Sequence, residues 1–123
     1  MKPRTLFEKL WSSHVVQELE GGAALLAIDR IFLHERTGSV ALKSLKDAGR
    51  TVADPARVFC TMDHIVDTHP GRGDDTRMKG GTAFILETRA AALEAGIRLF
   101  DVRDPLQGIV HVIVLKTVRP SLA

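Results

Sequence analysis

The chain has 123 residues, 45% of them hydrophobic, and 17 lysines and arginines against 15 aspartates and glutamates leave a formal net charge of +2. This length suits one domain with a single core of ordinary size. Because the basic excess is small and interspersed with acids, and five phenylalanines and one tryptophan are too few for a base-stacking platform, we expect no nucleic-acid partner. The apolar runs fall short of the roughly 20 residues that span a bilayer, so we expect no membrane segment.

Cys60 is the only cysteine of the chain. A single thiol excludes an intramolecular disulfide and cannot by itself hold a zinc ion or an iron–sulfur cluster. Glu8 and Lys9 interrupt the N-terminal sequence before any apolar stretch of signal-peptide length. We therefore expect a cytoplasmic protein in which Cys60 is a small core residue.

The first predicted element is a helix over residues 6–18. Thr5 and Glu8 have the spacing of a capping box, in which each side chain accepts a hydrogen bond from the other residue's backbone amide. The apolar residues recur at helical spacing, so we expect this stripe to face the core. It consists of Phe7, Leu10, Trp11 and Val15.

Two apolar runs follow, over residues 23–28 and 31–33, and the first of them has the length of a strand. A second helix is predicted next, capped by Thr37 or Ser39 and stopped by Gly49. The residues of this helix that we expect to be buried are Val40, Ala41, Leu45 and Ala48.

The second half of the chain predicts a strand over 58–62 and a Gly-rich loop over 69–75. A helix over 83–95 comes next, with Thr82 as its cap. Strands are then predicted over 97–100 and 108–115, from their continuous apolar character. Helices that alternate with nearly all-apolar strands are typical of a layered α/β/α architecture with a parallel or mixed sheet.

In such a sheet, ligands bind beyond the carboxyl ends of the strands. Asp63 and His64 directly follow the strand predicted over 58–62. A neighbouring carboxylate orients an imidazole and raises its basicity, which suits a general acid near neutral pH. Asp63 and His64 are therefore candidate catalytic residues, and a surface pair without a function is the alternative interpretation.

Two further histidines follow or interrupt apolar runs. His111 lies within residues 109–113, where burial of the ring without a partner costs about 1 to 3 kcal/mol. It is either a satisfied core histidine or an imidazole that points into an active cleft. His34, followed by Glu35, is either another site residue or part of a solvated pair.

A metal site is a competing hypothesis, because His34, His64 and His111 together with Asp63 form a mixed nitrogen and oxygen donor set. No two histidines have the spacing of three or four that places ligands on one helix face. We therefore favour acid–base chemistry and assign no metal ligand.

Five sequence blocks, in one order, resemble the start of the large subunits of 3-isopropylmalate dehydratases, which belong to the aconitase superfamily. The blocks are TLFEKL (5–10), IDR (28–30), HE (34–35), TMDH (61–64) and QGIVHVI (107–113). The resemblance implies part of an aconitase-type α/β/α domain.

The resemblance implies a hydro-lyase of leucine biosynthesis that removes water from 2-isopropylmalate and adds it back at the neighbouring carbon. It also implies a [4Fe-4S] cluster as Lewis acid, a hydroxy-acid substrate and a small-subunit partner. By this similarity His64, oriented by Asp63, protonates the departing hydroxyl. His111 lines the cleft near the cluster, and His34 helps to hold the substrate or a bound water.

The segment 114–123 departs from the family pattern, and the cluster-binding cysteines of the family lie in sequence that this chain does not include. We therefore expect an incomplete domain over 1–123 with a divergent tail over 114–123, and neither a bound cluster nor activity for the chain alone. One alternative is a non-catalytic remnant or interaction module, which would self-associate through an unpaired sheet edge at 109–115. A second alternative is a metal-dependent hydrolase.

Overall fold

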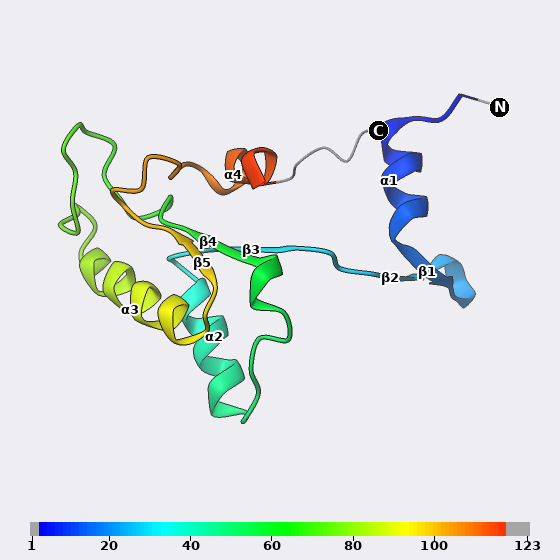
Figure 1. Cartoon of the computed structure of the whole chain (residues 1–123), viewed down its shortest axis with the longest axis horizontal. Helices are drawn as coiled ribbons and strands as arrows, with labels where there is room; N and C mark the ends of the chain where they lie inside the picture. The colour runs from blue at the N-terminus through cyan, green and yellow to red at the C-terminus, as the bar shows by residue number, and fades with distance from the viewer. Residues whose placement is uncertain (1–2, 118–123) are drawn as a thin grey trace.

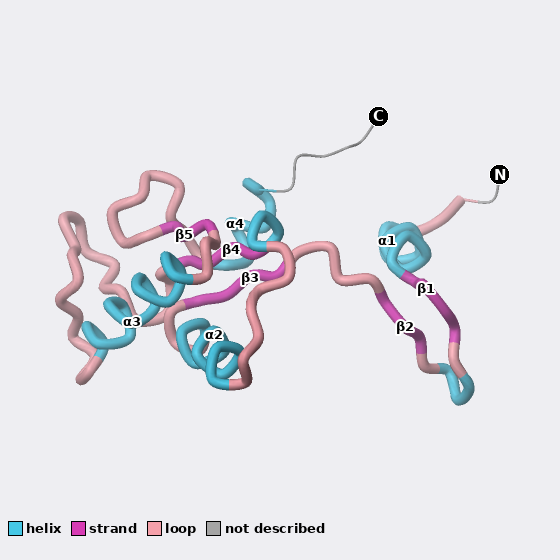
Figure 2. Tube along the Cα trace, turned by 60° about the horizontal axis from the view of Figure 1, so that its bottom comes forward, coloured by secondary structure: helices cyan, strands magenta, loops and turns pink. Residues whose placement is uncertain are grey.

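The computed structural model of the chain describes residues 3–117 (Figure 1). The elements in chain order are α1 (Leu6–His14), β1 (Val15–Glu18), the short helix η1 (Glu20–Gly22), β2 (Ala24–Leu26), β3 (Ile31–His34), α2 (Gly38–Asp47), the short helix η2 (Pro55–Arg57), β4 (Val58–Thr61), α3 (Gly81–Glu94), β5 (Arg98–Phe100) and α4 (Val110–Thr117). Figures 1 and 2 show two parts: an arm, residues 5–28, and a body that contains all the elements from β3 onward. Within residues 3–117, no helix has the length and apolar character needed to cross a membrane.

The body is a three-layer α/β/α unit, as predicted. Its sheet has the order β3-β4-β5, and both strand pairs are parallel. Helices α2 and α3 lie on one face of the sheet and α4 lies on the other (Figure 2). Alternate residues of β4 divide between these faces. Val58 and Cys60 pack in a cluster with Leu42 of α2 and Ala92 of α3.

The segment predicted as a strand over 108–115 is instead the helix α4, so that prediction is wrong. A short apolar run of this kind does not by itself distinguish a strand from a buried helix. Among its large apolar residues only Ile113 is fully buried, whereas Val112 and Leu115 are exposed. The unpaired sheet edge expected at 109–115 is therefore not formed. The predicted divergent tail begins inside α4, and residues 118–123 lie outside the described part of the chain.

The arm agrees with the sequence prediction at the helix N-terminus and differs from it in two other ways. The capping box forms, because Thr5 Oγ1 accepts from the Glu8 amide at 3.2 Å and the Thr5 amide donates to Glu8 Oε2 at 2.6 Å. However, α1 ends at His14, and the following residues pair antiparallel with β2 in a separate ribbon. The stripe predicted to face the core is mostly exposed, since α1 contains no buried residue.

The buried face of α2 is also rotated from the prediction. The buried residues of α2 are Gly38, Ser39 and Leu42, whereas Val40 is exposed. The start of this helix lies very close to β3. A Cβ atom added to Gly38 would be only 3.2 Å from the Leu33 Cβ atom, so a glycine at this position permits the close approach.

Helix α3 begins one residue before its predicted cap. Gly80 is the N-cap, and Thr82 instead donates a hydrogen bond to the Asp74 carbonyl at 3.0 Å. The Gly-rich loop is present as predicted, and an ion-pair cluster ties it to the body. Arg89 donates to the Asp74 carboxylate at 3.0 and 2.8 Å and to the Asp101 carboxylate at 2.6 and 2.9 Å. Hydrogen bonding to Arg89 lowers the pKa of both carboxyl groups.

Candidate functional site

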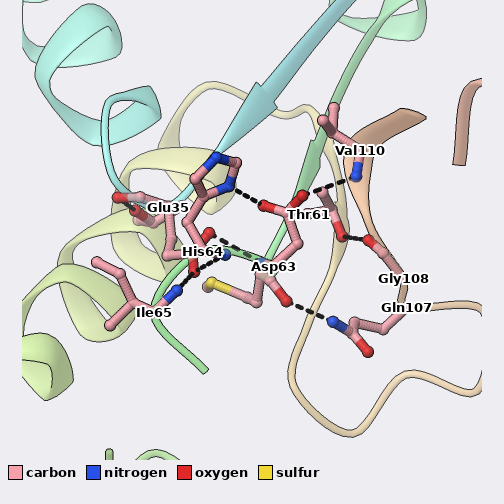
Figure 3. A network of polar contacts seen from close by, with 10 residues as sticks. Glu35, Thr61, Asp63, His64, Ile65, Gln107, Gly108 and Val110 are labelled. Atoms are coloured by element: carbon pink, nitrogen blue, oxygen red, sulfur yellow. Dashed lines mark hydrogen bonds and ion pairs between the residues drawn. The ribbon is translucent and has the colours of Figure 1, made fainter. Parts of the chain in front are cut away.

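The candidate site lies where β3 and β4 end. The two strands are parallel neighbours, and His34 is paired with Thr61 in their register. Both chains therefore leave the sheet side by side, and Figure 3 shows Glu35, Asp63 and His64 together at this edge. His34, Glu35, Asp63 and His64 each contribute one polar atom to a group whose atoms all lie within 4.8 Å of one another.

Glu35 fixes the backbone of this edge, although its side chain is completely buried. Its carboxylate accepts hydrogen bonds from three consecutive backbone amides. The distances are 2.9 Å from the Asp63 amide and 2.7 Å from the His64 amide, and the third donor is the Ile65 amide. The Glu35 carbonyl in turn accepts from the buried Thr88 hydroxyl at 3.1 Å. Three amide donors compensate for the burial of the carboxylate and hold the 63–65 turn in one conformation.

Sequence reasoning did not identify Glu35 as a site residue and left open that it is solvated. The position of Glu35 in the sequence could have indicated its role. Glu35 and its neighbour His34 lie at the end of a strand, just as Asp63 and His64 follow the neighbouring strand.

Asp63 orients His64. The Asp63 side chain is 2% exposed, and its Oδ1 atom lies 2.6 Å from His64 Nδ1. Its Oδ2 atom accepts from the Val110 amide at 2.7 Å, so the same carboxylate caps the N-terminus of α4. Because a carboxylate accepts, His64 Nδ1 carries the proton of this hydrogen bond. Nε2 is then the ring nitrogen that can exchange a proton with a reacting molecule. The His64 side chain is 42% exposed, which leaves its ring accessible to a reacting molecule.

His34 lies against the His64 ring. The two ring centroids are 3.8 Å apart and the planes are 15° from parallel, so the imidazoles are stacked. Among the described residues, His34 Nδ1 is buried and has no hydrogen-bond partner. A buried polar atom without a partner calls for an explanation, and a ligand or a bound water supplies one. His34 therefore brings an unused hydrogen-bonding atom to the site.

The segment before α4 is tied to the same strand end. Thr61 Oγ1 donates to the Gly108 carbonyl at 2.8 Å. The Gln107 side-chain amide donates to the Met62 carbonyl and accepts from Arg72, a residue of the Gly-rich loop. These contacts hold the start of α4 beside the end of β4, where Asp63 and His64 lie.

His111 lies on helix α4 and not on the strand predicted over 108–115. The structure places it on α4, exposed, one residue after the Val110 amide that donates to Asp63. It is therefore neither a core histidine nor a member of the group formed by His34 and His64. Its role in lining a cleft stays a prediction.

The geometry of the four-residue group does not suit a metal ion. An imidazole binds a metal in the plane of its ring, and two parallel stacked rings do not direct their nitrogens to one point. The oxygens of Glu35 already accept three amides, and both oxygens of Asp63 are hydrogen-bonded. The arrangement is better suited to holding and transferring a proton.

Cys60 is not placed to ligate an iron–sulfur cluster. The residue is 1% exposed and lies inside β4, packed against α2 and α3. Burial in particular, together with the nearby carboxylates of Glu35 and Asp63, raises the pKa of its thiol to about 12. A cluster is held by several cysteine thiolates, and this chain has one protonated, buried thiol. The residues present do not fit a [4Fe-4S] cluster.

Comparison with known proteins gives one matching family and a clear relative. The Aconitase family (aconitate hydratase) matches residues 8–121. The 3-isopropylmalate dehydratase large subunit 2 of Salmonella typhimurium is 42% identical over 114 residues, which cover 92% of this chain and 24% of that relative. The chain thus spans about a quarter of the relative's length. No solved structure matches the chain significantly.

Replacing Glu35 with glutamine should destabilise the site. A glutamine side chain offers one acceptor and turns two donors toward backbone amides, so at least one buried amide loses its partner. We expect Glu35→Gln to lower the free energy of unfolding by about 1 to 3 kcal/mol, measured by chemical denaturation. The amide proton resonances of residues 63–65 should shift upfield. Glu87→Gln, at an exposed position of α3, is the matched control and should change stability by less than about 0.5 kcal/mol. Equal effects of the two variants would contradict the role of Glu35.

A metal titration tests the interpretation of the four-residue group. Because the rings are stacked and the carboxylates are occupied, we expect calorimetry with Zn²⁺ or Mn²⁺ to show no saturable one-to-one binding that depends on His64. Stoichiometric binding that disappears in both His34→Asn and His64→Asn would show that a metal centre is present after all.

Proposed function

This chain belongs to the aconitase family, and on that basis we propose that it supplies part of the active site of a hydro-lyase that interconverts 2-isopropylmalate and 3-isopropylmalate in leucine biosynthesis. The identity to a 3-isopropylmalate dehydratase large subunit supports this substrate class. The observation that carries the proposal is the His64 imidazole, which a buried Asp63 orients and whose side chain is 42% exposed.

In this proposal His64 is the general acid of the dehydration. Hydroxide is a poor leaving group, so the departing oxygen needs a proton as the carbon–oxygen bond breaks. The bond's electron pair stays with the oxygen, which takes the proton from His64 Nε2 and leaves as water. Asp63 stabilises the charged imidazole before the transfer and keeps its ring in position afterwards. We assign removal of the proton from the neighbouring carbon to a base outside residues 3–117.

His34 and His111 have secondary roles in this proposal. His34 holds a substrate oxygen or a bound water through Nδ1, the nitrogen that has no partner among the described residues. The stacked His34 ring also limits the tilt of the His64 ring. His111, exposed near the start of α4, faces the cleft that the substrate enters.

We propose that the cluster of the family is held by polypeptide outside this chain, and we derive no step through it. A small subunit of the dehydratase is the partner in this proposal, and the cytoplasm is the compartment. The chain then contributes the acid side of the site as one incomplete domain, with no turnover of its own.

A chimaera tests the proposed function. The matched segment of the Salmonella typhimurium large subunit 2 is replaced with this chain, and conversion of 2-isopropylmalate is followed in the presence of the small subunit. We expect the chimaera to be active and His64→Asn to lower kcat by about 10² to 10⁴, the usual contribution of a general acid.

His69→Asn is the matched control for this experiment. His69 is also exposed and lies 3.7 Å from a carboxylate, that of Asp67, but it belongs to the Gly-rich loop. Its substitution should leave kcat within about twofold, because His69 is not part of the four-residue group. A folded chimaera without activity would favour the non-catalytic remnant, and equal losses in both variants would remove His64 as the acid.

Reconstitution of the chain with iron and sulfide, without oxygen, tests the cofactor assignment. Because Cys60 is buried and protonated, we expect neither the visible absorbance of a cluster nor hydratase turnover. A stoichiometric cluster accompanied by turnover would show that this chain is sufficient by itself.

A further inference from the structure

Arg72, in the Gly-rich loop, is a half-buried arginine that pairs with no carboxylate among the described residues. Its Nη2 atom donates to the neutral side chain of Gln107, and its Nε atom is buried without a hydrogen-bond partner in the part of the chain that the structure describes. Removing a guanidinium from water is costly unless an anion or a full set of acceptors replaces the lost hydration. Arg72 therefore lacks the counter-charge that its burial calls for.

The carboxylates that follow β5 do not supply this charge. Asp101 shares Arg89 with Asp74 of the Gly-rich loop, through hydrogen bonds of 2.6 to 3.0 Å. Asp104 accepts from Arg98 at 2.7 Å. Each of these acids is thus matched to an arginine other than the one at position 72.

The other acids near the loop are also engaged or turned to solvent. Asp67 accepts from the Arg77 amide at 3.2 Å, and Asp75 is exposed. Both oxygens of Asp63 are hydrogen-bonded, and the Glu35 carboxylate accepts three backbone amides. An anion from outside the described chain is what would complete the surroundings of this guanidinium.

One neutral side chain connects Arg72 to the strand end that carries the proposed acid. The Gln107 carbonyl oxygen accepts from Arg72, and the Gln107 amide group donates to the Met62 carbonyl. Asp63 and His64 follow Met62 directly, and Figure 3 shows the Gln107 side chain reaching this strand end. The unmatched positive charge therefore lies beside the site and not on a remote surface.

The substrate class of the proposed function provides such an anion. 2-Isopropylmalate carries two carboxylates, one on each of the two carbons that take part in the dehydration. A guanidinium can donate two parallel N–H bonds to one carboxylate, which fixes the orientation of a ligand as well as its position.

We propose that Arg72 binds one of the two substrate carboxylates. This inference rests on the proposed function for the identity of the ligand. Arg72 then orients the substrate while His64 supplies the proton, and the Gly-rich loop gains a role as a substrate-binding segment.

The chimaera described above tests this contact. We expect Arg72→Gln to raise KM for 2-isopropylmalate by about 10- to 100-fold, because a hydrogen-bonded charge pair is lost. The value of kcat should stay within about threefold, because Asp63 and His64 are unchanged. Arg72→Lys keeps the charge but not the parallel donors, so its KM should lie between those of the other two proteins. Steady-state kinetics gives KM and kcat, and calorimetry gives the dissociation constant of 2-isopropylmalate.

Two monocarboxylate analogues separate a direct contact from a structural effect. 3-Hydroxy-4-methylpentanoate and 2-hydroxy-2,3-dimethylbutanoate each lack a different one of the two carboxylates. We expect Arg72→Gln to weaken the binding of one analogue and to leave the other unchanged, because only one of them keeps the carboxylate that Arg72 binds. Equal weakening of both, measured by calorimetry, would mean that Arg72 only supports the fold of the loop.

Arg103→Gln is the matched control. Arg103 is exposed and approaches the same loop, since a Cβ atom added to Gly73 would lie 3.2 Å from Arg103 Nη2. The substitution removes the same charge but leaves the link between Arg72 and Gln107 intact. It should change KM by less than about twofold. Equal increases in KM for the two variants would assign the effect to the net charge of the loop and overturn the proposal.

The readouts keep this inference separate from the proposed function. If the chimaera is active and Arg72→Gln changes neither KM nor the dissociation constant, the carboxylate contact is wrong and the function stands. If the chimaera binds 2-isopropylmalate through Arg72 without turnover, the contact stands and the function is wrong. A chimaera that does not bind 2-isopropylmalate contradicts both.

Discussion

The site depends on one buried carboxylate that accepts three consecutive backbone amides. Glu35 follows β3, and the amides of residues 63–65 follow β4, so these hydrogen bonds join the two strand ends where parallel pairing leaves backbone groups free. A buried carboxylate without such donors would be strongly unfavourable, and buried amides without an acceptor would be costly too. Each therefore requires the other, and the turn that carries Asp63 and His64 is held from inside the protein.

Asp63 connects this turn to the opposite layer of the fold. One oxygen orients the His64 ring, and the other accepts the amide at the start of α4. The Arg89 ion pairs secure the Gly-rich loop on the α3 side, and Gln107 links that loop's Arg72 to the strand end. The acid is thus positioned by contacts from both helical layers, while its side chain remains 42% exposed.

The sequence predicted those features that depend on nearby residues. The capping box of Thr5 and Glu8 spans three positions, and the Asp63–His64 pair is adjacent in the chain. Features that depend on distant partners were missed. Glu35 accepts from amide donors 28 to 30 positions away, and the helix that starts at Val110 is capped by a carboxylate 47 positions earlier. The apolar stripe of α1 has the correct helical period, but periodicity does not reveal whether the covering surface belongs to the same folded unit.

The shared carboxylate of Asp63 has a consequence for the order in which the protein is made. Residues 63 and 64 leave the ribosome well before Val110, and domains begin to fold during synthesis. Until the start of α4 arrives, one oxygen of Asp63 lacks its amide partner and the carboxylate is free to rotate away from the imidazole. The proton donor is therefore completed only when the residues around Val110 have been synthesised, so a nascent chain that ends before them carries the residues of the acid without its geometry.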